Sequence, residues 1–254
     1  PKYSIKNHEI TGAEALVRWE RDNGTILSPN SFIPVYENNG KITDLDFYVF
    51  TRVVEFIAEN LKAGIEQVPI SINASSLHAS DPQTIDIYMN ILKKHGVDPA
   101  MVEIELTETA VVSEYKSVRK LFDSFQMHGI KTAMDDFGSG YSVLNTIVDI
   151  PVDVIKIDRG FITSCLETDR GIYFLKHLIA MIQNLGYQII CEGVETDEQI
   201  EILRQIGCDE IQGYWYSKPL PMEDYKELLQ TEKISKGGGK TPKQTKSPKI
   251  CFRQ

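Results

Sequence analysis

Short runs of β-branched and aliphatic residues alternate along the chain with longer stretches whose apolar residues recur every three or four positions. This alternation predicts strands connected by helices, and hence a mostly parallel sheet. About eight such units in roughly 230 residues match a TIM-type (β/α)8 barrel better than an open sheet, although periodicity alone leaves a doubly wound sheet possible. The expected strands are Lys2–Lys6, Gly12–Trp19, Val68–Ala74, Val102–Leu106, Lys131–Asp135, Val152–Ile157, Gln188–Glu192 and Glu210–Trp215.

Several helix boundaries are marked by local signals. Thr196 and Gln199 have the spacing of a capping box, and the helix that they open is expected to close at Gly207. Pro221 is expected to start a last helix that ends near Gln230. Another helix shows one apolar face, formed by Ile172, Leu175, Leu178, Ile179, Ile182 and Leu185.

The composition is that of a globular protein: 254 residues, of which 42% are hydrophobic and 25% charged. No apolar run approaches the length of about 18 residues needed to span a membrane. The four cysteines lie far apart without a Cys-x-x-Cys pair, which predicts reduced thiols in a cytoplasmic protein. Because the chain begins with Pro1 rather than Met, we expect a fragment of a longer protein, in which a membrane anchor or a sensor domain is possible.

The charge is unevenly distributed. A formal net charge of −9 argues against polymeric nucleic acid as a partner. Residues 231–254 are basic and poor in apolar residues, so we expect a folded domain over residues 1–230 followed by a disordered tail. The tail is interpreted as a solvated segment, with an arm that attracts nucleic acid or lipid as the alternative.

Every expected strand after Lys2–Lys6 carries a polar residue near its C-terminal end. In a barrel such residues converge at one rim, whereas the alternative is that each only marks where a strand meets solvent. Converging carboxylates repel one another unless a cation lies between them, and an all-oxygen ligand set favours Mg²⁺ or Mn²⁺ over zinc. The residues are Glu14, Asn73, Glu105, Asp135, Asp136, Lys156, Glu192 and Gln212.

Asp135 and Asp136 are adjacent and would point to opposite faces of a regular strand. Both reach one site only if the strand ends there and the chain turns, which Gly138 and Gly140 permit. Such a pair can bridge two metal ions about 3.5–4 Å apart, the arrangement used for phosphodiester hydrolysis. Asp136, Phe137 and Gly138 also spell a kinase Mg²⁺ motif, but the chain lacks the other kinase motifs.

In this order, the motifs resemble those of the EAL domain family of cyclic di-GMP phosphodiesterases. The resemblance covers residues 1–222 and implies a TIM-type barrel with one antiparallel strand near the N-terminus, the first strand being truncated here. It rests on Glu14-Ala15-Leu16-Val17-Arg18-Trp19, Asn73-Ala74-Ser75, Glu105-Leu106-Thr107-Glu108, Asp135-Asp136-Phe137-Gly138-Ser139-Gly140-Tyr141-Ser142, Lys156-Ile157-Asp158, Glu192-Gly193-Val194-Glu195-Thr196 and Gln212-Gly213-Tyr214.

The resemblance also implies an activity: hydrolysis of cyclic di-GMP to linear pGpG by a metal-activated water, in a homodimer, with two Mg²⁺ or Mn²⁺ ions. It implies that Glu14, Asn73, Glu105 and Asp135 hold one ion and that Asp135 and Asp136 hold the other. The implied catalytic residues are Lys156, which holds the attacking water, together with Glu192 and Asp136.

For the substrate, the resemblance implies that Arg18 binds a phosphate, that Leu16 packs nearby, and that Gln212 and Glu195 contribute further contacts. Glu108 is expected to clamp the loop with Gly138 and Gly140 and to couple the site to dimerisation. Two alternatives stay open: a non-catalytic cyclic di-GMP receptor or interaction module, and a metal-dependent barrel that acts on another phosphate ester. The complete set of expected ligands, with the lysine, favours the active enzyme.

Overall fold

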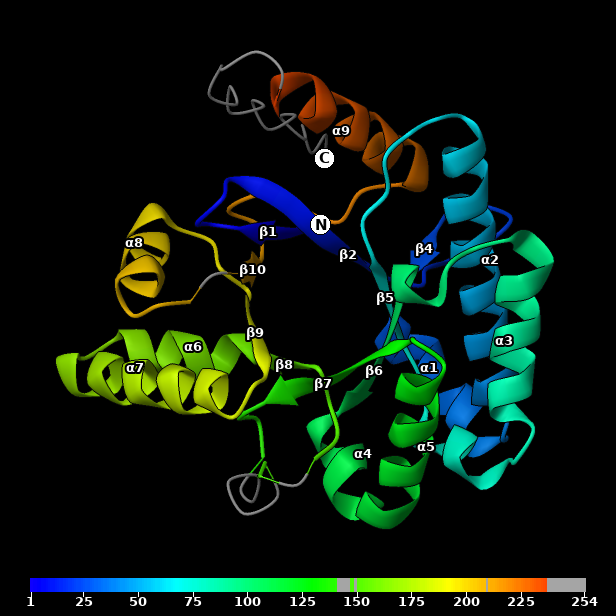
Figure 1. Cartoon of the computed structure of the whole chain (residues 1–254), viewed down its shortest axis with the longest axis horizontal. Helices are drawn as coiled ribbons and strands as arrows, with labels where there is room; N and C mark the ends of the chain where they lie inside the picture. The colour runs from blue at the N-terminus through cyan, green and yellow to red at the C-terminus, as the bar shows by residue number, and fades with distance from the viewer. Residues whose placement is uncertain (141–146, 149, 209, 237–254) are drawn as a thin grey trace.

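The computed structural model describes residues 1–140, 147–148, 150–208 and 210–236. Eight strands form a closed barrel in the order β1–β10–β9–β8–β7–β6–β5–β2, and helices surround them on the outside (Figure 1). The predicted TIM-type barrel is therefore confirmed, and the closed strand order excludes the doubly wound sheet.

The strands of the barrel are parallel, apart from the first. β1 pairs antiparallel with both β2 and β10, so the expected antiparallel strand near the N-terminus is the one that closes the barrel. The barrel strands are β1 (Lys2–Ser4), β2 (Glu9–Ala15), β5 (Ile70–Asn73), β6 (Val102–Thr107), β7 (Lys131–Phe137), β8 (Val154–Ile157), β9 (Gln188–Glu192) and β10 (Glu210–Gln212). A separate two-stranded sheet consists of β3 (Trp19–Glu20) and β4 (Ile26–Leu27).

The helices of the described residues follow the strands and cover the outside of the barrel (Figure 1). None of them is long and apolar enough to cross a membrane. They are α1 (Pro29–Asn38), α2 (Ile42–Lys62), α3 (Thr84–His95), α4 (Glu108–Ser113), α5 (Tyr115–Met127), α6 (Arg159–Leu166), α7 (Asp169–Asn184), α8 (Asp197–Gln205) and α9 (Met222–Lys236), with short 3-10 helices at Ser76–Ser80 and Pro99–Met101.

Two helix signals are confirmed in detail. The Thr196 side chain accepts a hydrogen bond from the Gln199 amide, and the Gln199 side chain accepts one from the Thr196 amide, which completes the capping box of α8. Gly207, just beyond this helix, has a φ of 89°, which glycine adopts without a steric penalty. The apolar face predicted for another helix is confirmed at Leu175, Leu178, Ile179 and Ile182, the buried residues of α7. Leu185, predicted to share that face, lies beyond the end of the helix and is exposed.

Several element ends differ from the prediction, and three of them are as follows. The strand predicted to run to Trp19 ends at Ala15, because its pairing with β5 ends there and Trp19 pairs instead with Leu27 in the small sheet. β10 ends at Gln212 rather than at Trp215. The last helix continues to Lys236, and the remainder of the basic tail lies outside the described residues, as does Cys251.

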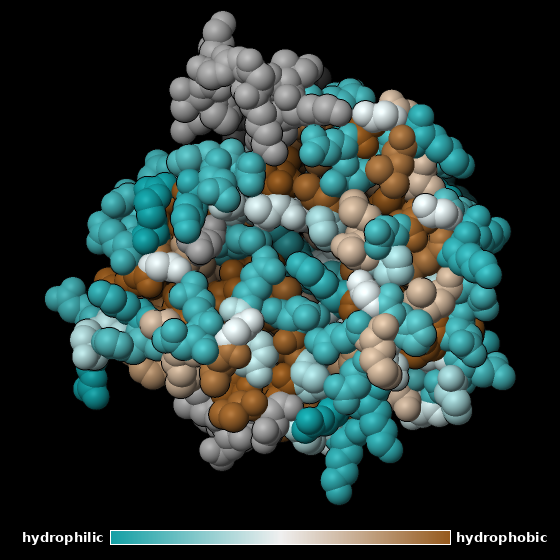
Figure 2. All heavy atoms as spheres, in the orientation of Figure 1, coloured by the Kyte–Doolittle hydropathy of each residue, from teal (hydrophilic) through white to brown (hydrophobic). Residues whose placement is uncertain are grey.

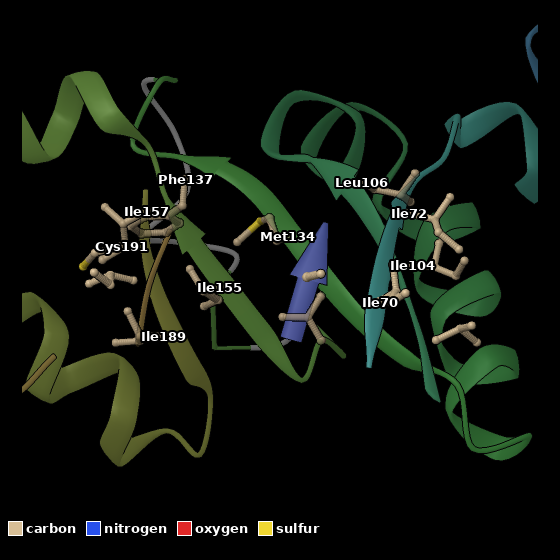
Figure 3. Close-up of a cluster of buried hydrophobic side chains, with 14 of the residues drawn as sticks. Ile70, Ile72, Ile104, Leu106, Met134, Phe137, Ile155, Ile157, Ile189 and Cys191 are labelled. Atoms are coloured by element: carbon tan, nitrogen blue, oxygen red, sulfur yellow. The ribbon is translucent and has the colours of Figure 1, made fainter. Parts of the chain in front are cut away.

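The strands bury side chains both outside the barrel, beneath the helices, and inside it, because successive side chains of a strand point to opposite faces. The outer faces of β5 to β9 supply the apolar core beneath the helices, as Figure 3 shows. Each fully buried aliphatic side chain there contributes about 1.5–3 kcal/mol. On the inner face, Ala133, Val154 and Ile190 form a separate small cluster. The labelled outer residues are Ile70, Ile72, Ile104, Leu106, Met134, Phe137, Ile155, Ile157, Ile189 and Cys191.

Figure 2 shows a face that is mostly hydrophilic, with hydrophobic patches between the polar side chains. Beneath this surface, Cys165, Cys191 and Cys208 are free thiols.

Candidate active site

Lys156 of β8 lies at the centre of four carboxylates that come from four different strands. Its Nζ lies 2.7 Å from Glu105 Oε2, 2.8 Å from Glu192 Oε1, 3.2 Å from Asp135 Oδ1 and 3.3 Å from Glu14 Oε2. The lysine side chain is 0% exposed. The structure thus brings together the polar strand ends of β2, β6, β7, β8 and β9, which sequence alone could only place one by one.

Two amide side chains join this cluster through Glu14. Asn73 Nδ2 donates to Glu14 Oε1 at 2.8 Å, and Gln212 Nε2 donates to Glu14 Oε2 at 2.6 Å. Gln212 Oε1 is buried and accepts no hydrogen bond among the described residues. This oxygen is therefore an available acceptor beside the carboxylates, because a buried polar atom without a partner is costly.

Asp135 and Asp136 reach the site differently from the prediction. β7 does not end at Asp135 but continues to Phe137, and its register with β8 shifts between Met134 and Phe137. Asp136 has a φ of 58°, and its amide donates to Asp135 Oδ1 at 2.9 Å. The expected strand end is therefore replaced by an irregularity of the bulge type, which re-aims side chains without ending the strand.

The carboxylates fall into two groups that fit divalent cations. Ligand oxygens of Glu14, Glu105 and Asp135 lie within 4.8 Å of one another, and so do those of Asp135, Asp136 and Glu192. Asp135 belongs to both groups, as a bridging ligand requires. Because all donors are oxygens, the chemistry of the set fits Mg²⁺ or Mn²⁺.

The site perturbs the protonation of its own carboxyl groups. Burial raises the pKa of Asp135 to about 6 and that of Glu192 to about 8, and the neighbouring carboxylates act in the same direction. Burial would also raise the pKa of Glu105, but Lys156 and Lys2 lower it to about 2. Burial would lower the pKa of Lys156, yet the surrounding carboxylates raise it well above its ordinary value.

Glu108 holds the segment that follows the acidic pair. Its Oε2 accepts a hydrogen bond from the Gly138 amide at 2.8 Å. A side chain at Gly140 would collide with Glu108 Oε1. The contacts agree with the expected clamp on this segment, whereas Tyr141 and Ser142 of the same motif lie outside the described residues.

Three predicted substrate residues lie outside the carboxylate cluster. Arg18 donates to the carbonyl of Val17, and Leu16 is 40% exposed. Glu195 pairs with Arg159, whose Nη1 lies 2.9 Å from Glu195 Oε1. Leu16 directly follows β2, and Glu195 lies shortly after β9, so these residues lie at the same end of the barrel as the cluster.

Lys2 is a residue of this site that no sequence motif indicated. Its Nζ lies 2.6 Å from Glu103 Oε1 and 3.1 Å from Glu105 Oε1, inside the barrel. Burial lowers the pKa of Lys2, but Glu105 and Glu103 overcome this and raise it, so the ammonium stays charged. One signal was present in the sequence: the period of two in β6 places Glu103 on the same face as Glu105.

Comparison with known proteins finds relatives of this chain. The EAL domain family matches residues 1–219. Cyclic di-GMP phosphodiesterase NbdA of Pseudomonas aeruginosa is 32% identical over 229 residues, which are 90% of this chain and 29% of that protein. Oxygen sensor protein DosP of Escherichia coli is 33% identical over 224 residues, 88% of this chain and 28% of that protein. The chain therefore spans less than a third of the length of these relatives.

A solved structure shows the same fold. The PaMucR phosphodiesterase, in complex with c-di-GMP, superposes with a TM-score of 0.81 and 29% sequence identity, over 89% of this chain and 91% of that one.

Proposed function

Because the chain belongs to the EAL domain family, we propose that it hydrolyses one phosphodiester bond of cyclic di-GMP to linear pGpG and so lowers a bacterial second messenger. The observation that carries this proposal is the buried Lys156 surrounded by four carboxylates, one of which belongs to both candidate metal groups. The acidic groups, the amides and the lysine expected for the reaction are all present and together.

Different residues of the site are proposed to bind the metal ions and the attacking water. Glu14, Asn73, Glu105 and Asp135 would hold one cation, and Asp135 and Asp136 would hold a second, with Glu192 beside them. The chemistry that two Mg²⁺ or Mn²⁺ ions supply is a hydroxide nucleophile near neutral pH and neutralisation of phosphate charge. Lys156 Nζ, a charged ammonium at the centre of the carboxylates, would hold the attacking water by donating a hydrogen bond to its oxygen.

Residues at the strand ends orient the dinucleotide. The free Oε1 of Gln212 accepts a hydrogen bond from water or substrate. Arg18 turns from the Val17 carbonyl to a phosphate, for which its planar guanidinium offers two parallel donors. Leu16 packs against the substrate, and Glu195 contributes a further contact. Polymeric nucleic acid is not proposed as a partner.

Two further parts of this proposal concern the assembly of the domain and its cellular location. We propose that the domain acts as a homodimer and that Glu108 transmits the state of the dimer to the site through Gly138 and Gly140. We propose a cytoplasmic setting, either alone or as a domain of a membrane protein, because the cysteines of the described residues are free thiols, which a reducing compartment favours.

A turnover assay with identification of the product tests the function. Purified protein with Mg²⁺ or Mn²⁺ is expected to convert cyclic di-GMP to pGpG, as read by chromatography and mass spectrometry. Tight binding without turnover in the presence of bound metal would instead establish the receptor function. Turnover of a different phosphate ester, with cyclic di-GMP left intact, would establish the third alternative.

A further inference from the structure

Lys2 is a buried cation that the proposed chemistry does not use. It lies on β1, the antiparallel strand that closes the barrel, and it is 4% exposed. Its Nζ contacts both Glu103 Oε1, at 2.6 Å, and Glu105 Oε1, at 3.1 Å. A lysine is almost never buried to this extent without a specific partner, and here the two carboxylates hold the ammonium in place.

The barrel provides space for the lysine stem. Lys2 pairs in register with Gly12 of β2. A Cβ atom at Gly12 would lie 3.2 Å from Lys2 Cδ and 3.2 Å from the Pro69 carbonyl oxygen, both tighter than ordinary contacts. The φ of Gly12 is not in the left-handed region, so this glycine serves close approach rather than a turn.

Glu105 is consequently held at both carboxylate oxygens. Oε2 accepts from Lys156 at 2.7 Å, while Oε1 accepts from Lys2 at 3.1 Å. Lys156 is shared among four carboxylates, whereas Lys2 has only Glu103 and Glu105 as charged partners among the described residues. Glu103 balances the charge of Lys2, so the pair orients Glu105 without adding net charge to the site.

We propose that Lys2 is a positioning residue that fixes the orientation of the Glu105 carboxylate for metal binding. The proposal rests on the proposed function, in which Glu105 is a metal ligand. A ligand carboxylate that is free to rotate loses affinity, and removal of such a supporting partner typically costs about 10–100-fold in metal affinity or activity. The alternative is that Lys2 and Glu103 only join β1 to β6 and stabilise the fold.

Two variants that differ only at position 2 separate these roles. Glu103→Gln keeps the Lys2 contact with Glu105 and is the reference for the comparison, because the loss of the Glu103 charge is then common to both variants. Lys2→Met in the Glu103→Gln background removes that contact and is expected to weaken Mn²⁺ binding about 10-fold. Loss of a positive charge by itself strengthens cation binding, so weaker binding cannot be a simple charge effect.

The measurement is Mn²⁺ titration by calorimetry or electron paramagnetic resonance, after thermal unfolding has shown both proteins to be folded. A folded Lys2→Met/Glu103→Gln protein that binds Mn²⁺ as tightly as Glu103→Gln overturns the proposal. Should that variant not fold, Lys2→Gln/Glu103→Gln replaces it, because its two amides can bond each other while the shorter side chain no longer reaches Glu105. Equal affinity in this variant likewise overturns the proposal.

The Mn²⁺ titration needs no turnover, so it separates this inference from the proposed function. A parent protein that binds Mn²⁺ but leaves cyclic di-GMP intact overturns the phosphodiesterase activity, and the comparison at position 2 still decides the role of Lys2.

Discussion

Lys156 Nζ lies 2.7 Å from Glu105 Oε2, and neither side chain is exposed to solvent. This contact ties the lysine proposed for catalysis to a carboxylate proposed for metal binding. It also explains how several buried acids coexist, since an ammonium within hydrogen-bond distance supplies the cation that they require.

Replacement of Lys156 by Met is expected to reduce turnover by about 10²–10⁴-fold, because the ammonium that holds the attacking water is lost. Metal binding is expected to persist, since the carboxylate and amide ligands stay in place. Without metal, the buried carboxylates lose their cation, so the protein is expected to lose about 3–5 kcal/mol of stability. Turnover, Mn²⁺ titration and thermal unfolding with and without Mg²⁺ measure these effects. A loss of metal affinity equal to that of Glu14→Ala would contradict the role given to Lys156.

Replacement of Glu14 by Ala is expected to abolish turnover and to weaken metal binding strongly. Glu14 contributes to one group of candidate ligands and also accepts from Asn73 and Gln212, so its removal frees both amides. Mn²⁺ titration and the pGpG assay measure the outcome. Glu66→Ala, at an exposed position, is the matched control and is expected to behave like the parent. Normal metal binding by Glu14→Ala would exclude this residue as a ligand.

Metal binding at pH 7 is expected to release about one proton. Glu192, with a pKa of about 8, holds a proton at pH 7 in the absence of metal, whereas Asp135, with a pKa of about 6, is mostly ionised. A cation favours the charged carboxylates, so Mg²⁺ affinity should rise with pH and fall as pH drops through these values.

Calorimetry in buffers of different ionisation enthalpy measures the released protons. Glu192→Gln is expected to suppress the release at pH 7. An observed enthalpy that does not depend on the buffer would contradict the assignment.

Replacement of Gly138 by Ala is expected to destabilise the protein and to disturb the segment that carries Asp136. Gly138 has a φ of 97°, and a Cβ there would lie 2.6 Å from a ring atom of Phe161. The backbone strain alone costs about 1–3 kcal/mol.

Gly24→Ala is the matched control, because Gly24 has a φ of 79° with no atom within 4 Å of the added Cβ. Gly138→Ala should therefore lower the melting temperature more than Gly24→Ala and should also weaken Mn²⁺ binding. Equal destabilisation by the two substitutions, with metal affinity unchanged, would show that this segment does not support the site.

The sequence assigned the polar residues to separate strands, because each of these residues lies near the end of a distinct apolar run. It was less successful at element ends. The end of β2 was predicted at Trp19, beyond its actual end at Ala15. That end is set by the last pairing with β5, and the local sequence does not indicate where this pairing stops. The end of α9 was placed too early for a similar reason, because polar composition near Gln230 does not by itself end a helix.

By itself, the sequence determined the alternation of strands and helices, the polar strand ends and the resemblance to the family, because hydrophobic periodicity and motif order are local properties of the chain. The closed order of the strands decided between a barrel and a doubly wound sheet. Tertiary structure alone decided how Asp135 and Asp136 share a site and which carboxylates surround Lys156. It also decided that Lys2 reaches Glu105 from a strand remote in sequence. These relationships depend on register between strands, and register is set by the closure of the whole barrel rather than by any one segment.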